Sequence, residues 1–509
     1  MKALKKYRWP LTGALLGVLV FLAVYGVRVL DPTSVDWILN SLSPDPIQHY
    51  LGWELFRRSP VHLPYIGANY NAVYPFRTSV LFTDSLPLAA LFFKLLGGIL
   101  PTRFQYFGWW GLLCYALQGG LAQAVIARIA GVQPTFGRDD KGKAAIAISM
   151  SPGQTAKLWG SVLGAGVLVL FPALTIRMFA HTALAANWLV LLALYLWLRS
   201  DELMPTTRRA CLIWGGMGLL CAGIHLYYLP MVGLVLVGYA VRRALQKRGP
   251  AAVLLPIAAF CAAALAPVAA FCVTALAELF LLGAFAVNFA GYSNGYLSGA
   301  DYFGLFVPWL AQSWEQNVYA GIGTSLAVVL AVFGIVCNAR KAEKFFAAHR
   351  DWLIAGAVVL VLDLIAAGGN AITVNGKTLF TVPIPQFLMN FWAMFSSCAR
   401  LAWLAGMLLA AVGCGLVLRF WDNGVAPALM LAVCAVAQGW GQRSELFNRW
   451  TDYHYYGFRY ENKTLLTDPV WEQVAASGRY SHLAFATFDF EHNEFWDLVD
   501  FAADHGWTL

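Results

Sequence analysis

Long apolar segments recur along nearly the whole 509-residue chain, and short loops that carry most of the Lys and Arg separate them. Hydrophobic residues make up 59% of the sequence and charged residues only 12%, whereas a soluble domain carries roughly a quarter charged residues. The sequence therefore predicts an all-α polytopic membrane protein. The net charge of +8 is not read as nucleic-acid binding, because the positive residues cluster in a few loops, as membrane topology requires.

About eleven segments are expected to cross the membrane. Basic residues among the first eight positions place the N-terminus in the cytoplasm. The four later basic loops, near Arg138, Arg199, Arg242 and Arg340, can all face the cytoplasm only if segment 85–100 does not cross, so that segment is predicted to be a juxtamembrane helix. The predicted spans are 9–30, 104–127, 158–179, 182–198, 211–225, 229–241, 251–280, 324–336, 352–367, 401–418 and 426–440.

Three segments of the membrane module 1–440 are then external. These are the first loop 31–103, a Gly- and Tyr-rich loop 285–321, and segment 368–397, in which TVNGKTLF reads as a short hairpin with Asn-Gly at its turn. From residue 441 acidic residues outnumber basic ones, so 441–509 is expected to be a small external α/β piece. In it, 481–488 reads as a strand and 493–506 as a helix. The piece is either incomplete or docked on the external loops.

Residues 43–60, SPDPIQHYLGWELFRRSP, hold the densest polar group on this outer side. Pro44 and Pro46 are expected to keep Asp45 outside any regular helix, just before a helix that begins at Ile47. Asp45 is then either the cap of that helix or a catalytic carboxylate. His49 lies one helical turn later.

Other candidates come from separate outer loops and helix ends, and each has a structural alternative. His181 is a helix-end residue or a catalytic one, and His225 with Tyr227 and Tyr228 forms either an aromatic belt or a substrate contact. Asp363 lies within a span, as the partner of an Arg or as part of a transport path. The cations Arg57, Arg58 and Arg400 are membrane anchors or bind a lipid-borne phosphate.

The nine Cys lie in or beside apolar segments without motif spacing, so free thiols are expected rather than disulfides or a Cys metal site. No Walker, Rossmann or GxSxG pattern is present. The absence of a Walker motif argues against a self-powered pump.

The motifs DPIQHYLGWELF, FTDSLPL, RMFAHTALAANW and SCARLAW, in this layout, resemble the C-type (GT-C fold) glycosyltransferases, and among them a bacterial subgroup of uncharacterised membrane proteins. Asp45 matches the essential acid of that superfamily's first external loop, and Asp84 matches the start of its juxtamembrane helix. The chain departs from the pattern in two places. No second acid follows Asp45 two residues later, and the later external position carries His181 instead of Asp, which puts a required Mg²⁺ or Mn²⁺ in doubt.

The resemblance implies inverting transfer of a sugar from a polyprenyl-phosphate donor to a glycan, lipid or protein acceptor, outside a bacterial inner membrane. Asp45 would be the general base and the ligand of any metal, with His49 or His181 orienting it. Arg400, with Arg57 or Arg58, would bind the phosphate, and Asp84, His225, Tyr227 and Tyr228 would contact substrate. The rival functions are a transporter or flippase for a lipid-linked envelope precursor, and a non-catalytic envelope-assembly subunit.

Overall fold

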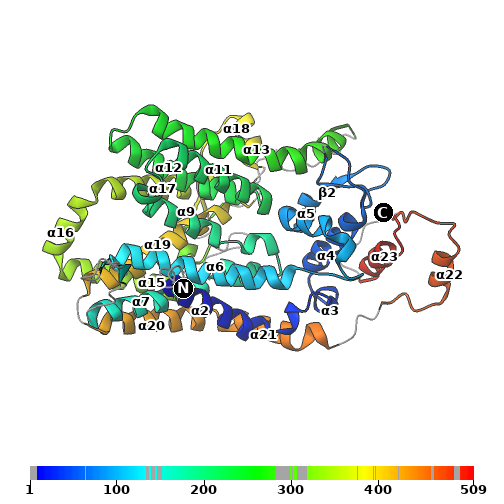
Figure 1. The fold of residues 1–509 in the computed structure, drawn as a ribbon, viewed down its shortest axis with the longest axis horizontal. Coiled ribbons are helices and arrows are strands. Elements are labelled where there is room, and N and C mark those ends of the chain that lie inside the picture. The colour runs from blue at the N-terminus through cyan, green and yellow to red at the C-terminus, as the bar shows by residue number, and fades with distance from the viewer. Residues whose placement is uncertain are drawn as a thin grey trace.

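In this computed structural model the long helices run mostly along one axis, and short elements gather at one end (Figure 1). Residues 8–509 are described, with gaps at 64, 133–136, 139–143, 146–151, 282–298, 301, 307–317, 375–376, 394, 396, 422–423, 460–463 and 486–492. The predicted loop 285–321 therefore lies largely outside the described residues.

The first part of the chain contains two long helices with the short elements of the 31–103 loop between them. Its elements are α2 (Arg8–Tyr25), η1 (Arg28–Leu30), α3 (Asp36–Leu39), α4 (Pro44–Arg58), β1 (Ala68–Asn69), β2 (Thr78–Ser79), η2 (Val80–Thr83), α5 (Pro87–Leu95), η3 (Gly97–Ile99), α6 (Phe107–Ala130), β3 (Gly137–Arg138) and β4 (Ala144–Ala145).

The middle part is almost entirely helical. It consists of α7 (Pro152–Val169), α8 (Pro172–Arg177), η4 (Thr182–Ala185), α9 (Trp188–Leu198), α10 (Ser200–Leu203), α11 (Thr207–Ile224), α12 (Tyr228–Leu245), α13 (Pro250–Leu281), η5 (Tyr302–Leu305), α15 (Ile322–Cys337), α16 (Ala339–Ala348) and α17 (Arg350–Gly368).

The last part begins with a hairpin and ends in short helices. It consists of β5 (Ala371–Val374), β6 (Lys377–Thr381), α18 (Gln386–Ala393), η8 (Cys398–Ala402), α19 (Trp403–Phe420), α20 (Ala426–Gly441), α21 (Arg443–His454), η9 (Tyr456–Phe458), α22 (Val470–Ala476) and α23 (Asn493–Asp504). The antiparallel pairing of β5 with β6, which brings Val374 opposite Lys377, confirms the predicted hairpin.

Five helices of the described chain are long and apolar enough to cross a membrane, and a sixth span results if the bent pair α15–α16 counts as one. This fits an all-α membrane protein, but the expected count of about eleven spans is wrong. Three further apolar helices, Leu11–Tyr25, Thr182–Leu198 and Ala426–Gly441, have only 10–17 residues, fewer than the roughly twenty that a span needs. The expected juxtamembrane segment is the nine-residue helix α5, which is also too short to cross.

Helix α4 begins earlier than the two prolines suggested. Its first residue is Pro44, and the side chain of Ser43 accepts a hydrogen bond from the Asp45 N–H, so Ser43 is the cap. The predicted start at Ile47 and the predicted capping role of Asp45 are therefore wrong. Both prolines fall in the first turn, where a backbone N–H has no helical partner to lose. Trp53 anchors the buried face of the helix by donating from Nε1 to the Phe104 carbonyl at 3.0 Å.

The segment after α20 folds back onto the 31–103 loop. Arg103 Nη2 lies 3.0 Å from Asp500 Oδ2 and 2.6 Å from Asp504 Oδ2, and the Leu509 N–H donates to the Asn71 carbonyl at 2.8 Å. The described part of this piece therefore docks on the 31–103 loop, and α23 confirms the predicted helix. Residues 481–485 form only a single parallel bridge, from His482 to Thr508, instead of a strand.

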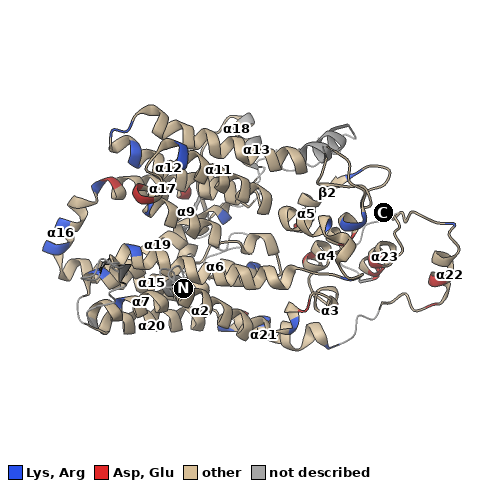
Figure 2. Cartoon of the chain, in the orientation of Figure 1, with Lys and Arg blue, Asp and Glu red and all other residues tan. Residues whose placement is uncertain are grey.

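Cations and short charged loops gather at the end of the molecule that carries α16, far from α4 (Figure 2). There Arg242, at the end of α12, pairs with Asp201 at 2.7 Å and with Asp351 at 2.9 Å. The other end of α12, where the helix begins at Tyr228, lies close to the predicted site. The long helices therefore separate a basic end from the end that holds most of the candidate residues.

Candidate functional site

The site forms around Asp84, in a turn between η2 and α5 where this residue has a left-handed backbone (φ 52°). The turn is held against α4 because the Ser85 hydroxyl donates to the His49 carbonyl at 2.7 Å. The Tyr106 hydroxyl fixes it from the other side by donating to the Ser85 carbonyl. Residues from three further elements then approach Asp84.

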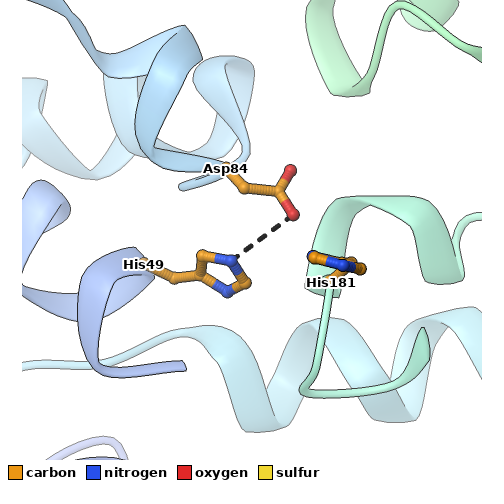
Figure 3. Close-up of side chains that lie close together, drawn as sticks. All are labelled: His49, Asp84 and His181. Atoms are coloured by element: carbon orange, nitrogen blue, oxygen red, sulfur yellow. Dashed lines mark ion pairs between the residues drawn. The ribbon is translucent and has the colours of Figure 1, made fainter. Parts of the chain in front are cut away.

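Two histidines flank the Asp84 carboxylate. His49, on α4 and only 3% exposed, places Nε2 3.5 Å from Asp84 Oδ2 (Figure 3). Its Nδ1 lies 3.3 Å from the Thr182 hydroxyl. His225, at the C-terminal end of α11, places Nε2 3.8 Å from Asp84 Oδ1. The two histidines therefore approach the two oxygens of Asp84 from different elements, His49 from α4 and His225 from the end of α11.

His181 and Asp45 form the outer part of the cluster. His181 precedes η4, and its Nδ1 lies 4.0 Å from Asp45 Oδ2 in the first turn of α4. Their side chains are 27% and 38% exposed, whereas that of His49 is 4% exposed. The cluster therefore runs from a buried imidazole to a carboxylate that solvent can reach.

Burial dominates the electrostatics of the inner part. It raises the pKa of Asp84 to about 7, a rise that Arg400 opposes and Asp45 increases. Burial also lowers the pKa values of His49 and His225, each to about 3; His181 adds to both shifts. Both imidazoles are therefore uncharged at neutral pH, so each carries its proton on one ring nitrogen and a lone pair on the other.

A polar cavity of about 420 Å³ opens beside Asp45 and His181. Its far wall comes from α21, which contributes Glu445, Arg449 and Asp452. Arg449 donates from Nε to Glu445 at 2.7 Å and from Nη2 to the Ile176 carbonyl at 2.8 Å, so it fixes this wall to the end of α8. The sequence interpretation missed these α21 residues; the acidic shift after residue 441 was their one signal.

The two arginines at the end of α4 lie outside the cluster. Arg57 donates to the Thr102 carbonyl at 3.0 Å and pairs with Glu54 at 3.2 Å. Arg58 pairs with Glu54 and with Asp504 of α23, at 3.2 and 3.3 Å. These contacts join α4 to the neighbouring loop and to the C-terminal segment, and none of them is with Asp45, Asp84 or the three histidines.

The remaining candidates divide between the site and its support. Arg400, in η8, lies 5.1 Å from the ring centre of Tyr227 and close enough to lower the pKa of Asp84. Tyr227 accepts the Ser397 N–H at 3.1 Å. Tyr228 is fully buried and donates to the Leu184 carbonyl at 2.6 Å. Tyr227 and Tyr228 therefore support the site, and Arg400 is the cation nearest its centre among the predicted residues.

Asp363, the intramembrane carboxylate, has a structural contact. Its Oδ2 accepts the N–H of Ala405 at 3.0 Å, in the first turn of α19, where helical N–H groups have no partner within the helix. The predicted arginine partner is thus replaced by a backbone amide. The eight cysteines whose side chains are described have free thiols.

Residues 14–443 match a family model described as a domain of unknown function, DUF6311. The match covers the membrane module and ends at the beginning of α21. No curated protein and no solved structure matches the chain.

Proposed function

The chain belongs to the DUF6311 family, and we propose that it is an inverting glycosyltransferase that uses a polyprenyl-phosphate-linked sugar at the outer face of a bacterial inner membrane. The observation that carries the proposal is the meeting of Asp45, Asp84, three histidines and Arg400 at the end of the bundle opposite the basic end. By the positive-inside rule that basic end would be cytoplasmic. The site and the C-terminal piece would then lie on the external side, as the resemblance to GT-C enzymes implies.

Asp45 is the proposed general base. It is the more exposed of the two carboxylates and lies in the wall of the polar cavity. An acceptor hydroxyl bound there would lose its proton to Asp45 as its oxygen attacks the anomeric carbon. The bond between that carbon and the phosphate oxygen breaks, and polyprenyl phosphate leaves. His181, 4.0 Å from Asp45, orients the carboxylate.

Arg400 is the proposed phosphate ligand. A guanidinium donates two parallel hydrogen bonds to phosphate oxygens, and Arg400 lies at the start of the apolar segment Cys398–Phe420. A donor whose prenyl chain remains in the membrane would bring its phosphate to this level. The cavity lined by α21 would hold the acceptor, whose hydroxyls find carboxylates and Arg449 there.

The test is turnover of radiolabelled polyprenyl-phosphate sugars by the purified protein, compared between wild type and Asp45→Asn. We expect the substitution to lower kcat by about 10²–10⁴-fold, because a general base contributes that much, and to leave donor binding intact. Glu343→Gln, an exposed carboxylate-to-amide change on α16 at the other end of the molecule, is the matched control. Equal rates for Asp45→Asn and wild type would remove Asp45 from the chemistry.

A transporter or flippase is the alternative, and Asp363 was its main support. The Oδ2 of that carboxylate accepts the Ala405 N–H, a contact that joins α17 to α19. Movement of an intact lipid-linked precursor across vesicles, without release of polyprenyl phosphate, would favour this alternative over sugar transfer.

A further inference from the structure

Three side chains at the centre of the cluster have the geometry of an open metal site. His49, Asp84 and His181 each offer one ligand atom, and these atoms lie within 4.8 Å of one another. The 3.5 Å from His49 Nε2 to Asp84 Oδ2 is close to the edge of about 3.3–3.4 Å that a tetrahedron has when its metal–ligand bonds are about 2.0–2.1 Å long. Small side-chain movements would therefore complete coordination.

The second nitrogen of His49 has the contact that a metal-binding histidine needs. When Nδ1 donates its proton to the Thr182 hydroxyl, 3.3 Å away, the lone pair lies on Nε2, which faces Asp84. Such outer contacts fix the tautomer and the ring orientation of ligating histidines. Because the His49 side chain is only 4% exposed, this orientation is also held by packing.

A carboxylate also lies beside His181. Its Nδ1 is 4.0 Å from Asp45 Oδ2, and one of its ring nitrogens lies within 4.8 Å of the ligand atoms of His49 and Asp84, beside which the ring stands in Figure 3. A carboxylate that holds one nitrogen of a histidine while the other binds metal is a recurring arrangement in zinc sites. Asp45 is thereby placed beside the ligand set and not in it.

His225 differs from the other two histidines in its tautomer. Its Nδ1 accepts the backbone N–H of Tyr227 at 3.2 Å, so the neutral ring carries its proton on Nε2. That nitrogen faces Asp84 Oδ1 at 3.8 Å and can donate to it, but it has no lone pair for a metal. His225 therefore orients the second oxygen of Asp84, and the protein supplies three ligands.

We propose that His49, Asp84 and His181 bind one divalent transition-metal ion of the class represented by Zn²⁺, with a coordination position left open. Two imidazoles and one carboxylate suit Zn²⁺ and its neighbours, whereas Mg²⁺ and Ca²⁺ prefer oxygen ligands. Three protein ligands with a fourth position free are the pattern of catalytic zinc sites. This assignment differs from the sequence analysis, which put Mg²⁺ or Mn²⁺ in doubt and named Asp45 as the ligand of any metal.

The role of the ion rests on the proposed function, although its binding does not. In glycosyl transfer the open position would take a phosphate oxygen of the donor, and Arg400 would bind a second one. The ion and the guanidinium would together stabilise the negative charge that develops on the leaving phosphate. Asp45, outside the coordination sphere, would stay free to accept the proton.

Metal binding is measured directly on the purified, chelator-stripped protein by titration calorimetry with Zn²⁺ and by visible absorption of bound Co²⁺. We expect one ion per chain, unaffected by excess Mg²⁺. Loss of a ligand in His49→Gln or Asp84→Asn is expected to weaken binding more than about 100-fold, and His225→Gln about 10-fold, because outer contacts contribute about 10–100-fold. His349→Gln, at the opposite end of the molecule, is the histidine control and should bind as wild type does.

X-ray absorption of the zinc-loaded wild-type protein identifies the metal ligands directly, so this test does not depend on whether a variant folds. Scattering from two imidazoles is expected, and its absence would overturn the assignment. So would Zn²⁺ binding by monodisperse Asp84→Asn at wild-type affinity, or no binding by the wild type. Stoichiometric binding without any sugar transfer would keep the metal site and refute only the proposed function.

Discussion

Gly52→Ala tests whether the packing of α4 against the η2–α5 turn positions the site. Gly52 lies on α4, and a Cβ built there would stand 2.4 Å from the Cβ of Thr83 and 2.6 Å from its hydroxyl oxygen. Thr83 immediately precedes Asp84 and is bonded to Ser85 by a hydroxyl contact of 2.7 Å. The added methyl group therefore pushes on the turn that carries Asp84.

The size of the effect follows from that contact. Ordinary van der Waals contact begins at 3.4 Å, so the turn must move by about 1 Å, and a displacement of about 1 Å at a reactive site costs roughly 100-fold in rate. The effect on overall stability is smaller. Overpacking costs about 1–3 kcal/mol, and replacing a mid-helix glycine by alanine returns about 1 kcal/mol. We expect a net loss of about 0–2 kcal/mol.

The assay compares Zn²⁺ affinity and sugar transfer with the melting temperature in detergent. Gly52→Ala should lower affinity and rate by about 10–100-fold or more while the protein still melts cooperatively. The control is Gly356→Ala on α17, where a Cβ meets nothing within 4 Å; it should be neutral or slightly stabilising and leave the site unchanged. Wild-type affinity and rate in Gly52→Ala would refute the reasoning that this contact sets the position of Asp84.

Two further predictions concern the surroundings of the site. Burial lowers the pKa of Lys94, on α5, to about 8, so the unfolded chain binds the extra proton between about pH 8 and 10.5 and stability should rise with pH across that window. The shift of about 2.5 units corresponds to about 3 kcal/mol, of which the contact with the Phe56 ring at 3.9 Å offsets about 1–2 kcal/mol. Lys94→Met should therefore stabilise the protein by about 1–2 kcal/mol near pH 7.5, and it should abolish the rise in melting temperature between about pH 8 and 10.5. A variant whose melting temperature rises with pH as steeply as that of wild type would contradict this. Asp500→Asn, which weakens the ion pair with Arg103, should loosen α23 by about 1–2 kcal/mol, seen as faster amide exchange in α23 and in no distant helix.

Some features of α4 could be predicted from the sequence, and others could not. The helix, its buried aromatic face and the polar character of its start follow from the pattern of residues 43–60. The start itself was misplaced because Pro44 and Pro46 were read as helix breakers, although proline is favoured in the first turn. Arg57 and Arg58 are predicted to bind phosphate together with Arg400, yet nine residues of helix, at about 1.5 Å each, put Arg58 about 13 Å along the helix from His49.

The convergence of Asp45, His49, Asp84, His181 and His225 could be expected from topology, because each lies on the same side of the predicted membrane. Which of these side chains contact one another could not be predicted from the sequence. It depends on the left-handed turn at Asp84 and on the tautomer that the Tyr227 amide imposes on His225. The α21 wall of the cavity could not be predicted from the sequence either, because it results from a long-range return of the chain after residue 441.

Sugar transfer is tested most directly by lipid-product analysis of wild-type protein in nanodiscs, supplied with a panel of polyprenyl-phosphate sugars and an extract of envelope acceptors. We expect release of free polyprenyl phosphate from at least one donor, in step with the appearance of a glycosylated acceptor of inverted anomeric configuration. Donors recovered intact, by a protein that still melts cooperatively, would contradict it.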